Sequence, residues 1–454
     1  MVVCGNVKSF EAQDNDRKAD SSAARQAKVT RDVLPNTPHS IFKVAMLSRT
    51  PTSIARRLSS ISSLRLFTTY LPNMSPIEPS DLDALHGPAG VEPATSHPKQ
   101  INAWSGPGPA AFDFRSDTIT TPTASMLNAI QNTTLLDDVF AEDPTTNSLE
   151  SHMASLTHHE ASLFVLSGTM GNQLALRSHL TQPPYSVLTD YRSHILNWEA
   201  GGVASLSGAM VQGVVPANGR YLTVSDIVKN AVISDDVHAC PTRVISLENT
   251  LGGVITPVEE IRKISEFAKK NNIKLHLDGA RIWEAVAAGA GSLSEFTGLF
   301  DSASLCFSKG LGAPVGSILV GKKEFIKHAR WMRKSIGGGL RQSGVLTAAA
   351  RVAVDETFGT GPNGEGGVLK KSHETARRLA DLWTSLGGKL ASDTETNMVW
   401  LDLDSAGLTS DEFIALGKKH GLRLGGGRLV VHYQIAEEAV TKMEQVLRAA
   451  MKKE

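Results

Sequence analysis

From Phe112 to the C-terminus, short apolar runs alternate with longer segments of helical periodicity, and this alternation limits the fold more than any other feature. In "ITPVEEIRKISEFAKKNNIKLHLDGAR", Thr256 is placed to cap a helix and Pro257 to occupy its first position. Apolar side chains recur from Val258 to Phe267 along one face, and "IKLHLD" then returns as a strand. Repeated units of this kind predict an α/β fold with a mostly parallel sheet.

Three of the expected strands end in residues that carry chemistry. Asp278 ends "IKLHLD", and Lys309 follows "SLCFS" in a loop with spaced glycines. The apolar run "ASLFVL" leads into a turn and a helix, where backbone N–H groups can bind a phosphate, at Ser167, Gly168 and Thr169. Since open α/β sheets bind ligands beyond the carboxyl ends of their strands, we expect these groups to lie near one another.

Pyridoxal phosphate matches this set of groups. Its aldehyde condenses with a lysine amine, its phosphate needs N–H donors, and its pyridine nitrogen stays protonated beside a carboxylate. The sequence therefore predicts a pyridoxal phosphate site that contains Lys309, Asp278 and the Ser167–Thr169 turn.

Each group has a simpler reading when it is taken alone. Lys309 could be a solvated loop lysine, Asp278 a helix cap, and the Ser167 turn an ordinary cap. The stretch from Gly316 to Lys323, "GSILVGKK", nearly matches a P-loop, but Lys323 stands where a hydroxyl is required and the interior reads as a strand. We reject the P-loop and expect His276, between two leucines, to be a buried core histidine.

The composition excludes several classes of protein. Lys and Arg number 46 and Asp and Glu number 46, so no net charge attracts nucleic acid or an acidic membrane. The three cysteines show neither zinc nor disulfide spacing, and no metal site is expected. No apolar run approaches the ~20 residues that span a bilayer. We expect a cytoplasmic protein without a membrane segment.

The first 111 residues differ from the rest and read as a disordered extension. Between Val33 and Ile77 there is no acidic residue, and segment 46–67 is rich in Arg and Ser. If translation begins at Met46, this composition predicts a transit peptide and the mitochondrial matrix; the alternative is a disordered basic tail.

From Phe112 onward the sequence resembles the threonine aldolases, a family of pyridoxal phosphate enzymes with the aspartate aminotransferase fold. The motifs that carry the resemblance are "FDFRSDTIT", "DDVFAEDPTTN", "LFVLSGTMGNQLAL", "SHILNWEAGG", "DDVHACPTRVISLENT", "LHLDGARIWEA", "SLCFSKGLGAPVGS" and "GGGLRQSG". The resemblance implies a large fold-type I domain with a mostly parallel seven-stranded sheet over 112–360 and a smaller C-terminal α/β domain over 361–454. It also implies cleavage of L-threonine or L-allo-threonine to glycine and acetaldehyde by a homotetramer, with active sites at dimer interfaces.

The resemblance also assigns roles to individual residues. Lys309 binds the cofactor covalently, Asp278 pairs with the pyridine nitrogen, and His194 stacks on the ring and is a candidate base. His238 lies near the substrate side chain. The remaining residues bind the cofactor phosphate (Ser167, Gly168, Thr169, Arg341), the substrate carboxylate (Ser116, Arg428), or either the phenolic oxygen or that carboxylate (Arg281).

Two other activities remain open at this point. An amino-acid racemase acting on alanine would use the same fold and cofactor, and a β-eliminating lyase is the next alternative. The chain also departs from the family in one motif, because Phe140 replaces the usual tyrosine and removes a hydroxyl.

Overall fold

The computed structural model describes residues 102–359 and 366–452, which all belong to one compact unit, Glu92–Glu454. The basic segment 46–67 and the expected extension up to residue 101 lie outside the described residues. The last part of that extension includes a 3₁₀ turn, Gly108–Phe112, which buries Ala110 and Ala111.

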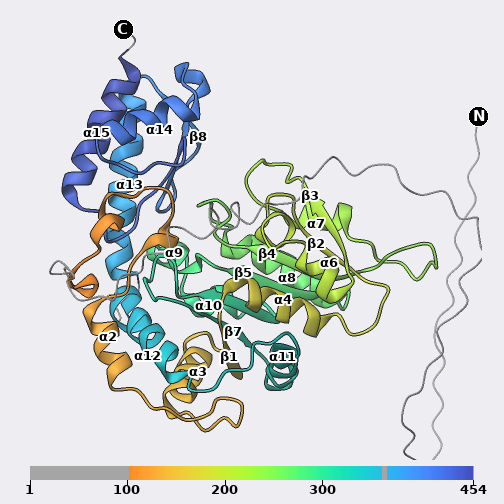
Figure 1. Cartoon of the computed structure of the whole chain (residues 1–454). Helices are drawn as coiled ribbons and strands as arrows, with labels where there is room; N and C mark the ends of the chain where they lie inside the picture. Colours follow the sequence, from red (N-terminus) through yellow and green to blue (C-terminus); the bar gives the residue numbers. More distant parts are fainter. Residues whose placement is uncertain (1–101, 360–365, 453–454) are drawn as a thin grey trace, which may run out of the picture. The chain divides into compact units, whose positions relative to one another are not determined.

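A seven-stranded sheet forms the centre of the unit (Figure 1). Its strand order is β1-β7-β6-β5-β4-β2-β3, and all neighbouring pairs are parallel except those that involve β7. The mostly parallel sheet predicted from the sequence is therefore confirmed. The strands are β1 (Ala161–Val165), β2 (Ser186–Asp190), β3 (Met210–Val214), β4 (Thr242–Glu248), β5 (Lys274–Gly279), β6 (Ser302–Cys306) and β7 (Ser317–Gly321).

Helices connect these strands, as the alternating pattern predicts. They are α2 (Ala124–Gln131), α3 (Pro144–Leu156), α4 (Gly168–His179), α5 (His194–Asn197), α6 (Gly202–Ser207), α7 (Val224–Asn230), α8 (Val258–Lys270), α9 (Ile282–Ala287), α10 (Leu293–Thr297), α11 (Lys323–Ser335) and α12 (Gly344–Val352). A π-helical segment, Ala353–Gly359, follows α12.

The strand β5 shows how the sheet separates its apolar face from a polar one. Leu275 and Leu277 enter the main hydrophobic core, whereas His276 and Asp278 alternate with them and point to the other face. Helix α4 packs across β4 to β7 and covers this polar face. The prediction that His276 is buried and hydrogen-bonded is confirmed, since it is 0% exposed.

One local expectation is wrong. Thr256 does not cap α8, which starts at Val258 with Pro257 in the N-cap position. Instead, the side chain of Asn249 accepts the Thr256 N–H at 3.2 Å and donates to the Thr256 carbonyl at 3.2 Å. The Thr256 backbone therefore pairs with Asn249, just after the end of β4, and Thr256 does not act as the helix cap.

A smaller three-stranded antiparallel sheet and its helices form the C-terminal part (blue in Figure 1). Phe112 and Phe114 pack into its core, so the first strand-like residues of the ordered chain join the last. Its elements are α13 (Gly367–Ser385), β8 (Lys389–Ser392), β9 (Met398–Asp402), α14 (Ser410–Lys419), β10 (Arg428–Val430) and α15 (Glu437–Met451).

Among the described residues, no helix combines the length and the apolar character that a membrane crossing requires.

Candidate active site

The candidate site lies where β1, β5 and β6 end. Asp278 is the penultimate residue of β5, Lys309 follows β6 closely, and Ser167 caps α4 just after β1. Because β5 and β6 are neighbours and α4 packs across both, the fold brings the predicted carboxylate, lysine and helix N-terminus to one edge of the sheet.

The glycines after Lys309 let side chains from three other segments approach the loop closely. Gly312 and Gly316 also have φ angles of 80° and 110°, which favour glycine. A Cβ atom would collide with Glu284 at Gly310, with Tyr433 at Gly312 and with Phe164 at Gly316. The spacing of glycines seen in the sequence therefore reflects packing around the lysine.

Lys309 itself has a fixed backbone and an available amine. Its carbonyl accepts a hydrogen bond from Thr120 Oγ1 at 2.8 Å, and its side chain is half-buried. Within 102–359 and 366–452, its amine has no hydrogen-bond or ion-pair partner. An unpaired amine on an anchored loop fits the lysine that a pyridoxal phosphate enzyme requires.

The start of α4 is open for an anion. The Ser167 hydroxyl accepts the Met170 N–H at 3.1 Å, so it caps the helix as the sequence suggests. The N–H groups of Gly168 and Thr169 belong to the first turn, where no intrahelical acceptor exists, and both residues are partly exposed. Such a helix end binds phosphate groups.

Asp278 is 3% exposed and accepts hydrogen bonds from two groups. Its Oδ2 accepts from Asn172 Nδ2 at 2.7 Å, and its Oδ1 accepts from the Ala280 N–H at 3.1 Å. Asn172 was not identified from the sequence. A buried carboxylate with such partners fits the group expected beside a protonated pyridine nitrogen.

His194 begins α5 and is held from both sides by glutamates. Its Nδ1 lies 2.9 Å from Glu199 Oε1, and its backbone N–H donates to Glu248 Oε2 at 2.8 Å. The hydrogen bond to Glu199 raises the pKa of His194; burial opposes the shift, and the Asp278 charge adds to it. Polar atoms of His194, Glu199 and Asp278 lie within 4.8 Å of one another, so the structure brings the two predicted residues together.

Glu248 is a second titratable group that the sequence analysis missed. It ends β4 and pairs in register with Asp278 on β5. Burial, and then the Asp278 charge, raise the pKa of Glu248 to about 7. Glu248 could have been identified from the sequence, because it ends a predicted strand as Asp278 does.

Arg281 forms a bidentate ion pair rather than standing free. Its Nε and Nη2 donate to Asp117 at 2.7 and 2.6 Å. Burial lowers the pKa of Arg281, but the charge and hydrogen bonds of Asp117 outweigh it and the pKa is raised. Asp117, directly after the predicted Ser116, is 0% exposed and was not identified from the sequence.

Arg428 lies near Arg281 without a carboxylate of its own. Its guanidinium donates to the Arg115 carbonyl at 3.0 Å and lies 5.8 Å from the Trp400 ring. Burial, and then the Arg281 charge, lower the pKa of Arg428. We call Arg281 and Arg428 the arginine pair. With Asp117 as its one carboxylate, the arginine pair leaves a positive charge next to Ser116 that suits a carboxylate ligand.

Two predicted residues form no hydrogen bond or ion pair with this group among the described residues. Arg341 is largely exposed and pairs with Asp137 at 2.8 Å, although the loop before it contacts the first turn of α4 through Gly338 and Met170. His238 lies in an exposed loop before β4, and its side chain is 90% exposed and bonded to Asp236.

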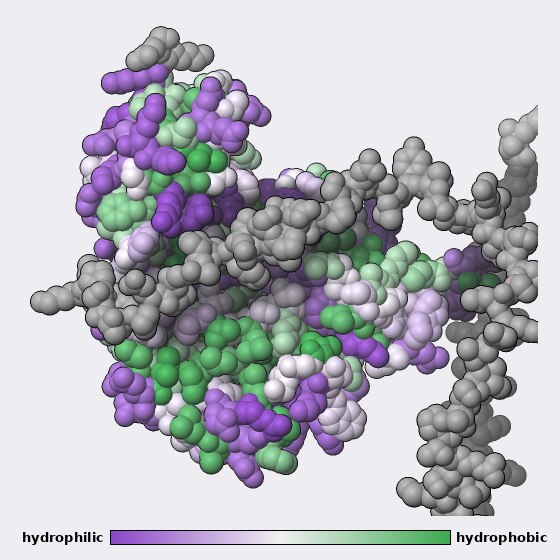
Figure 2. Space-filling model, in the orientation of Figure 1, coloured by the Kyte–Doolittle hydropathy of each residue, from purple (hydrophilic) through white to green (hydrophobic). Residues whose placement is uncertain are grey.

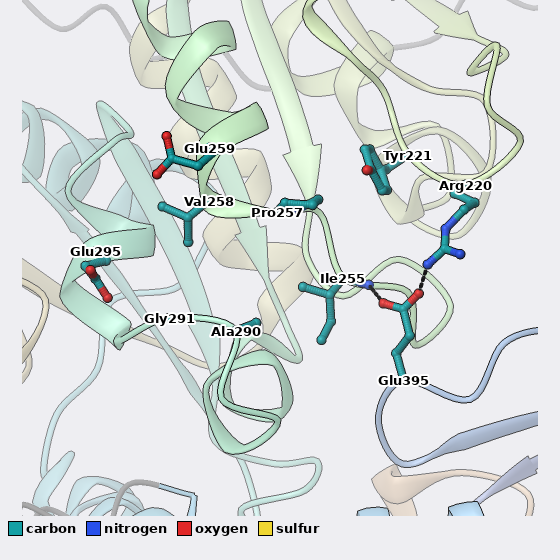
Figure 3. A pocket seen from close by; sticks show the side chains of 10 residues that line it. All are labelled: Arg220, Tyr221, Ile255, Pro257, Val258, Glu259, Ala290, Gly291, Glu295 and Glu395. Carbon is teal, nitrogen blue, oxygen red and sulfur yellow. Dashed lines mark hydrogen bonds and ion pairs between the residues drawn. The ribbon is translucent and has the colours of Figure 1, made fainter.

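A cavity of about 580 Å³ lies elsewhere, between the start of α8, segment 290–295 and Glu395 (Figure 3). Glu395 accepts the Ile255 N–H at 2.8 Å and pairs with Arg220 there. None of the predicted site residues lines this cavity, so the candidate site is defined by its chemical groups and not by this hollow.

The sheet order and the smaller C-terminal part are those of a fold-type I pyridoxal phosphate enzyme. The threonine aldolase of Leishmania major superposes with a TM-score of 0.64 at 19% identity, over 75% of this chain and 100% of that one, which supports the fold. The family model of the β-eliminating lyases matches residues 113–406.

Three relatives are similar over most of their length. Aldolase vrtJ of Penicillium aethiopicum is 58% identical, over 77% of this chain and 88% of the relative. Alanine racemase TOXG of Cochliobolus carbonum is 49% identical, over 77% and 90%. The low-specificity L-threonine aldolase of Eremothecium gossypii is 47% identical, over 75% and 88%. The chain belongs to the threonine aldolase family, among the pyridoxal phosphate-dependent β-eliminating lyases.

Proposed function

We propose that the protein cleaves L-threonine and L-allo-threonine to glycine and acetaldehyde. The observation that carries this proposal is the arginine pair next to Ser116, whose single carboxylate partner, Asp117, lies close enough to Lys309 to interact with its charge. Relatives named as an aldolase and as an L-threonine aldolase support it.

Pyridoxal phosphate supplies an electron sink that stabilises negative charge on the α-carbon of an amino acid. In this proposal Lys309 attaches the cofactor and Asp278 pairs with its pyridine nitrogen. The phosphate binds at the start of α4, to Ser167, Gly168 and Thr169, with Arg341 nearby.

The arginine pair and Ser116 would hold the substrate carboxylate. Arg428 has no carboxylate partner among the described residues, whereas Nε and Nη2 of Arg281 already donate to Asp117. Arg428 is therefore the better carboxylate ligand. Fixing the carboxylate limits rotation of the substrate and so selects which bond to the α-carbon breaks.

His194 would accept the proton of the substrate's β-hydroxyl. Its Nδ1 faces Glu199, which leaves Nε2 for the substrate, and 38% of its side chain is exposed. A histidine base contributes about 10²–10⁴-fold to proton transfer when it is positioned in this way.

We further propose that the protein is a homotetramer in which a second chain completes each site. His238 and its neighbour Val237 are highly exposed, which suits a loop that a partner covers. Apolar side chains also gather over α2, α12 and α3 (Figure 2). Val345 on α12 is exposed, and so are Leu135, Leu136 and Phe140 in the segment between α2 and α3. The Phe140 ring is 72% exposed.

Alanine racemization is the second candidate, because alanine racemase TOXG is 49% identical. Purified protein with pyridoxal phosphate should be given L-threonine, L-allo-threonine, L-alanine and L-serine separately. Aldol cleavage predicts glycine and acetaldehyde in equal amounts from the first two and little D-alanine from the third. Rapid formation of D-alanine with negligible acetaldehyde would favour the racemase, and pyruvate formation from L-serine alone would favour β-elimination.

A further inference from the structure

Asn172 on α4 donates both of its amide hydrogens to carboxylates. Its Nδ2 lies 2.7 Å from Asp278 Oδ2 and 2.9 Å from Glu199 Oε1, and the side chain is buried. One neutral side chain therefore contacts the carboxylate predicted to face the cofactor ring and the carboxylate that holds His194.

The orientation of this amide follows from its surroundings. Asn172 Oδ1 lies 3.1 Å from His276 Nε2, which can donate a hydrogen bond. The reversed amide would place an oxygen against Asp278 and Glu199, which accept hydrogen bonds when ionised and cannot donate. The nitrogen must therefore face the carboxylates.

The same logic fixes the direction of the next hydrogen bonds. His276 Nε2 donates to Asn172, so the neutral ring accepts at Nδ1, which lies 2.9 Å from Ser302 Oγ. Ser302 Oγ can then accept from His179 Nε2 at 2.8 Å. Burial lowers the pKa of His276 to about 3 and that of His179 to about 4, which keeps both rings neutral.

The result is a buried series of donors that ends on two carboxylates. It passes from His179 through Ser302, His276 and Asn172 to Asp278 and Glu199, and Glu199 also accepts from His194. Each polar hydrogen in the series has a single acceptor. Such fully satisfied networks hold their side chains rigidly, because any rotation leaves a buried group without a partner.

We propose that Asn172 is a positioning residue for the cofactor. Asn172 holds Asp278 and the Glu199–His194 pair in one arrangement, and His276 in turn orients Asn172. A leucine has a similar size but no donor, so it would leave two carboxylates close together without the amide between them. Asp278 would then be free to turn away from the pyridine nitrogen. The inference rests on the proposed role of Asp278, which Asp278→Asn tests separately, and it does not depend on which substrate is cleaved.

Gln173 offers a matched control from the same helix. Its Nε2 donates to Glu199 Oε2 at 2.6 Å, and it is buried like Asn172. No hydrogen bond joins Gln173 to Asp278 among the described residues. The variants Asn172→Leu and Gln173→Leu each remove an amide that supports Glu199, but only the first removes support from Asp278.

The first experiment compares these variants as full chains that melt as cooperative, folded proteins. We expect Asn172→Leu to weaken pyridoxal phosphate binding by about tenfold, the scale of one hydrogen bond to a charged group. With ¹⁵N-labelled cofactor, its ring-nitrogen resonance should move toward the unprotonated form. Gln173→Leu should stay within about twofold of wild type in affinity and keep the wild-type resonance. Unchanged binding and resonance in Asn172→Leu, or equal changes in both variants, would overturn the proposal.

A second measurement does not use Asn172→Leu and applies even if that variant does not fold. Histidine ¹⁵N spectra of the wild-type protein without cofactor should show His276 as the neutral Nε2–H tautomer, assigned by its loss in His276→Gln. The Nδ1–H tautomer would reverse the hydrogen bonds and overturn the proposal.

Discussion

The two sides of the candidate site are satisfied to different degrees. On the side of Asp278, Asn172 and Glu199, every described carboxylate has donors supplied by the chain itself. On the side of the arginine pair, Arg281 pairs with Asp117, and Arg428 has no carboxylate partner among the described residues. The first side therefore suits a cofactor that stays bound, and the excess positive charge on the second side suits a substrate carboxylate that binds and leaves.

The largest expected effect comes from Lys309→Ala, which removes the attachment of the cofactor. Activity with L-threonine should fall by more than about a thousandfold. In wild-type protein, borohydride should bleach the yellow colour and fix the cofactor on the peptide that contains Lys309. Lys323→Ala is the control, because Lys323 lies in the P-loop-like stretch that we rejected as a site. The Lys323→Ala protein should remain yellow and active. A Lys309→Ala protein with native turnover would exclude the proposed site.

The next largest effect tests the side of the site that contains Asp278. Asp278→Asn should keep much of the fold, since an amide can still accept from Asn172, but it cannot hold the pyridine nitrogen protonated. We expect kcat to fall at least about a hundredfold, where each decade corresponds to ~1.4 kcal/mol. Steady-state kinetics and thermal unfolding check this. Near-native turnover would mean that the carboxylate is structural.

A smaller effect tests the arginine pair on the other side. Arg428→Lys should keep the colour but lower kcat/KM for L-threonine by about tenfold to a hundredfold, because an ammonium cannot make two parallel bonds to a carboxylate. Glycine binding should weaken in parallel. Arg115→Lys is the control, since Arg115 already pairs with Asp113. If glycine affinity is unchanged in Arg428→Lys, Arg281 becomes the carboxylate ligand.

The smallest effect is a pH dependence of kcat/KM that is set by His194 and Glu199. If neutral His194 accepts the hydroxyl proton, kcat/KM should rise with pH through a pKa above the usual 6.5. Glu199→Gln removes the cause of that raised pKa, so the rise should move to lower pH. Because the folded-state pKa is raised, the pair stabilises the protein fully below pH 6.5 and loses this contribution as pH rises through the raised value.

Unfolding temperatures test the same pair. The difference between wild type and Glu199→Gln should be larger at pH 6 than at pH 9. Glu248→Gln distinguishes the alternative, because Glu248 has a pKa of about 7. If the rise in kcat/KM with pH disappears in Glu248→Gln and stays at the same pH in Glu199→Gln, the titrating group is Glu248 and not His194.

The sequence predicted the parts of the site that follow from local pattern. Strand periodicity located the ends of β5 and β6, and so placed Asp278 and Lys309 at one edge of a mostly parallel sheet. The turn before α4 was also evident, because Ser167 and the glycine after it are a local capping signal.

The missed residues depend on contacts between distant segments. Asn172 and Glu199 lie far apart in the sequence, and only the packing of α4 against the polar face of β5 joins them to Asp278. The alternation of leucine with His276 and Asp278 could have indicated that face. Asp117 was missed because its partner, Arg281, comes from a segment 164 residues away. The role of His238 stays a prediction, since its loop is exposed in a single chain.

A crystal structure of the holoenzyme with glycine bound is the most direct test of both sides of the site. We expect pyridoxal phosphate next to the Lys309 amine, its ring nitrogen beside Asp278, and the glycine carboxylate on Arg428 and Ser116. A cofactor in that place with the carboxylate bound elsewhere would contradict the proposed substrate side, and a cofactor away from Asp278 would contradict both.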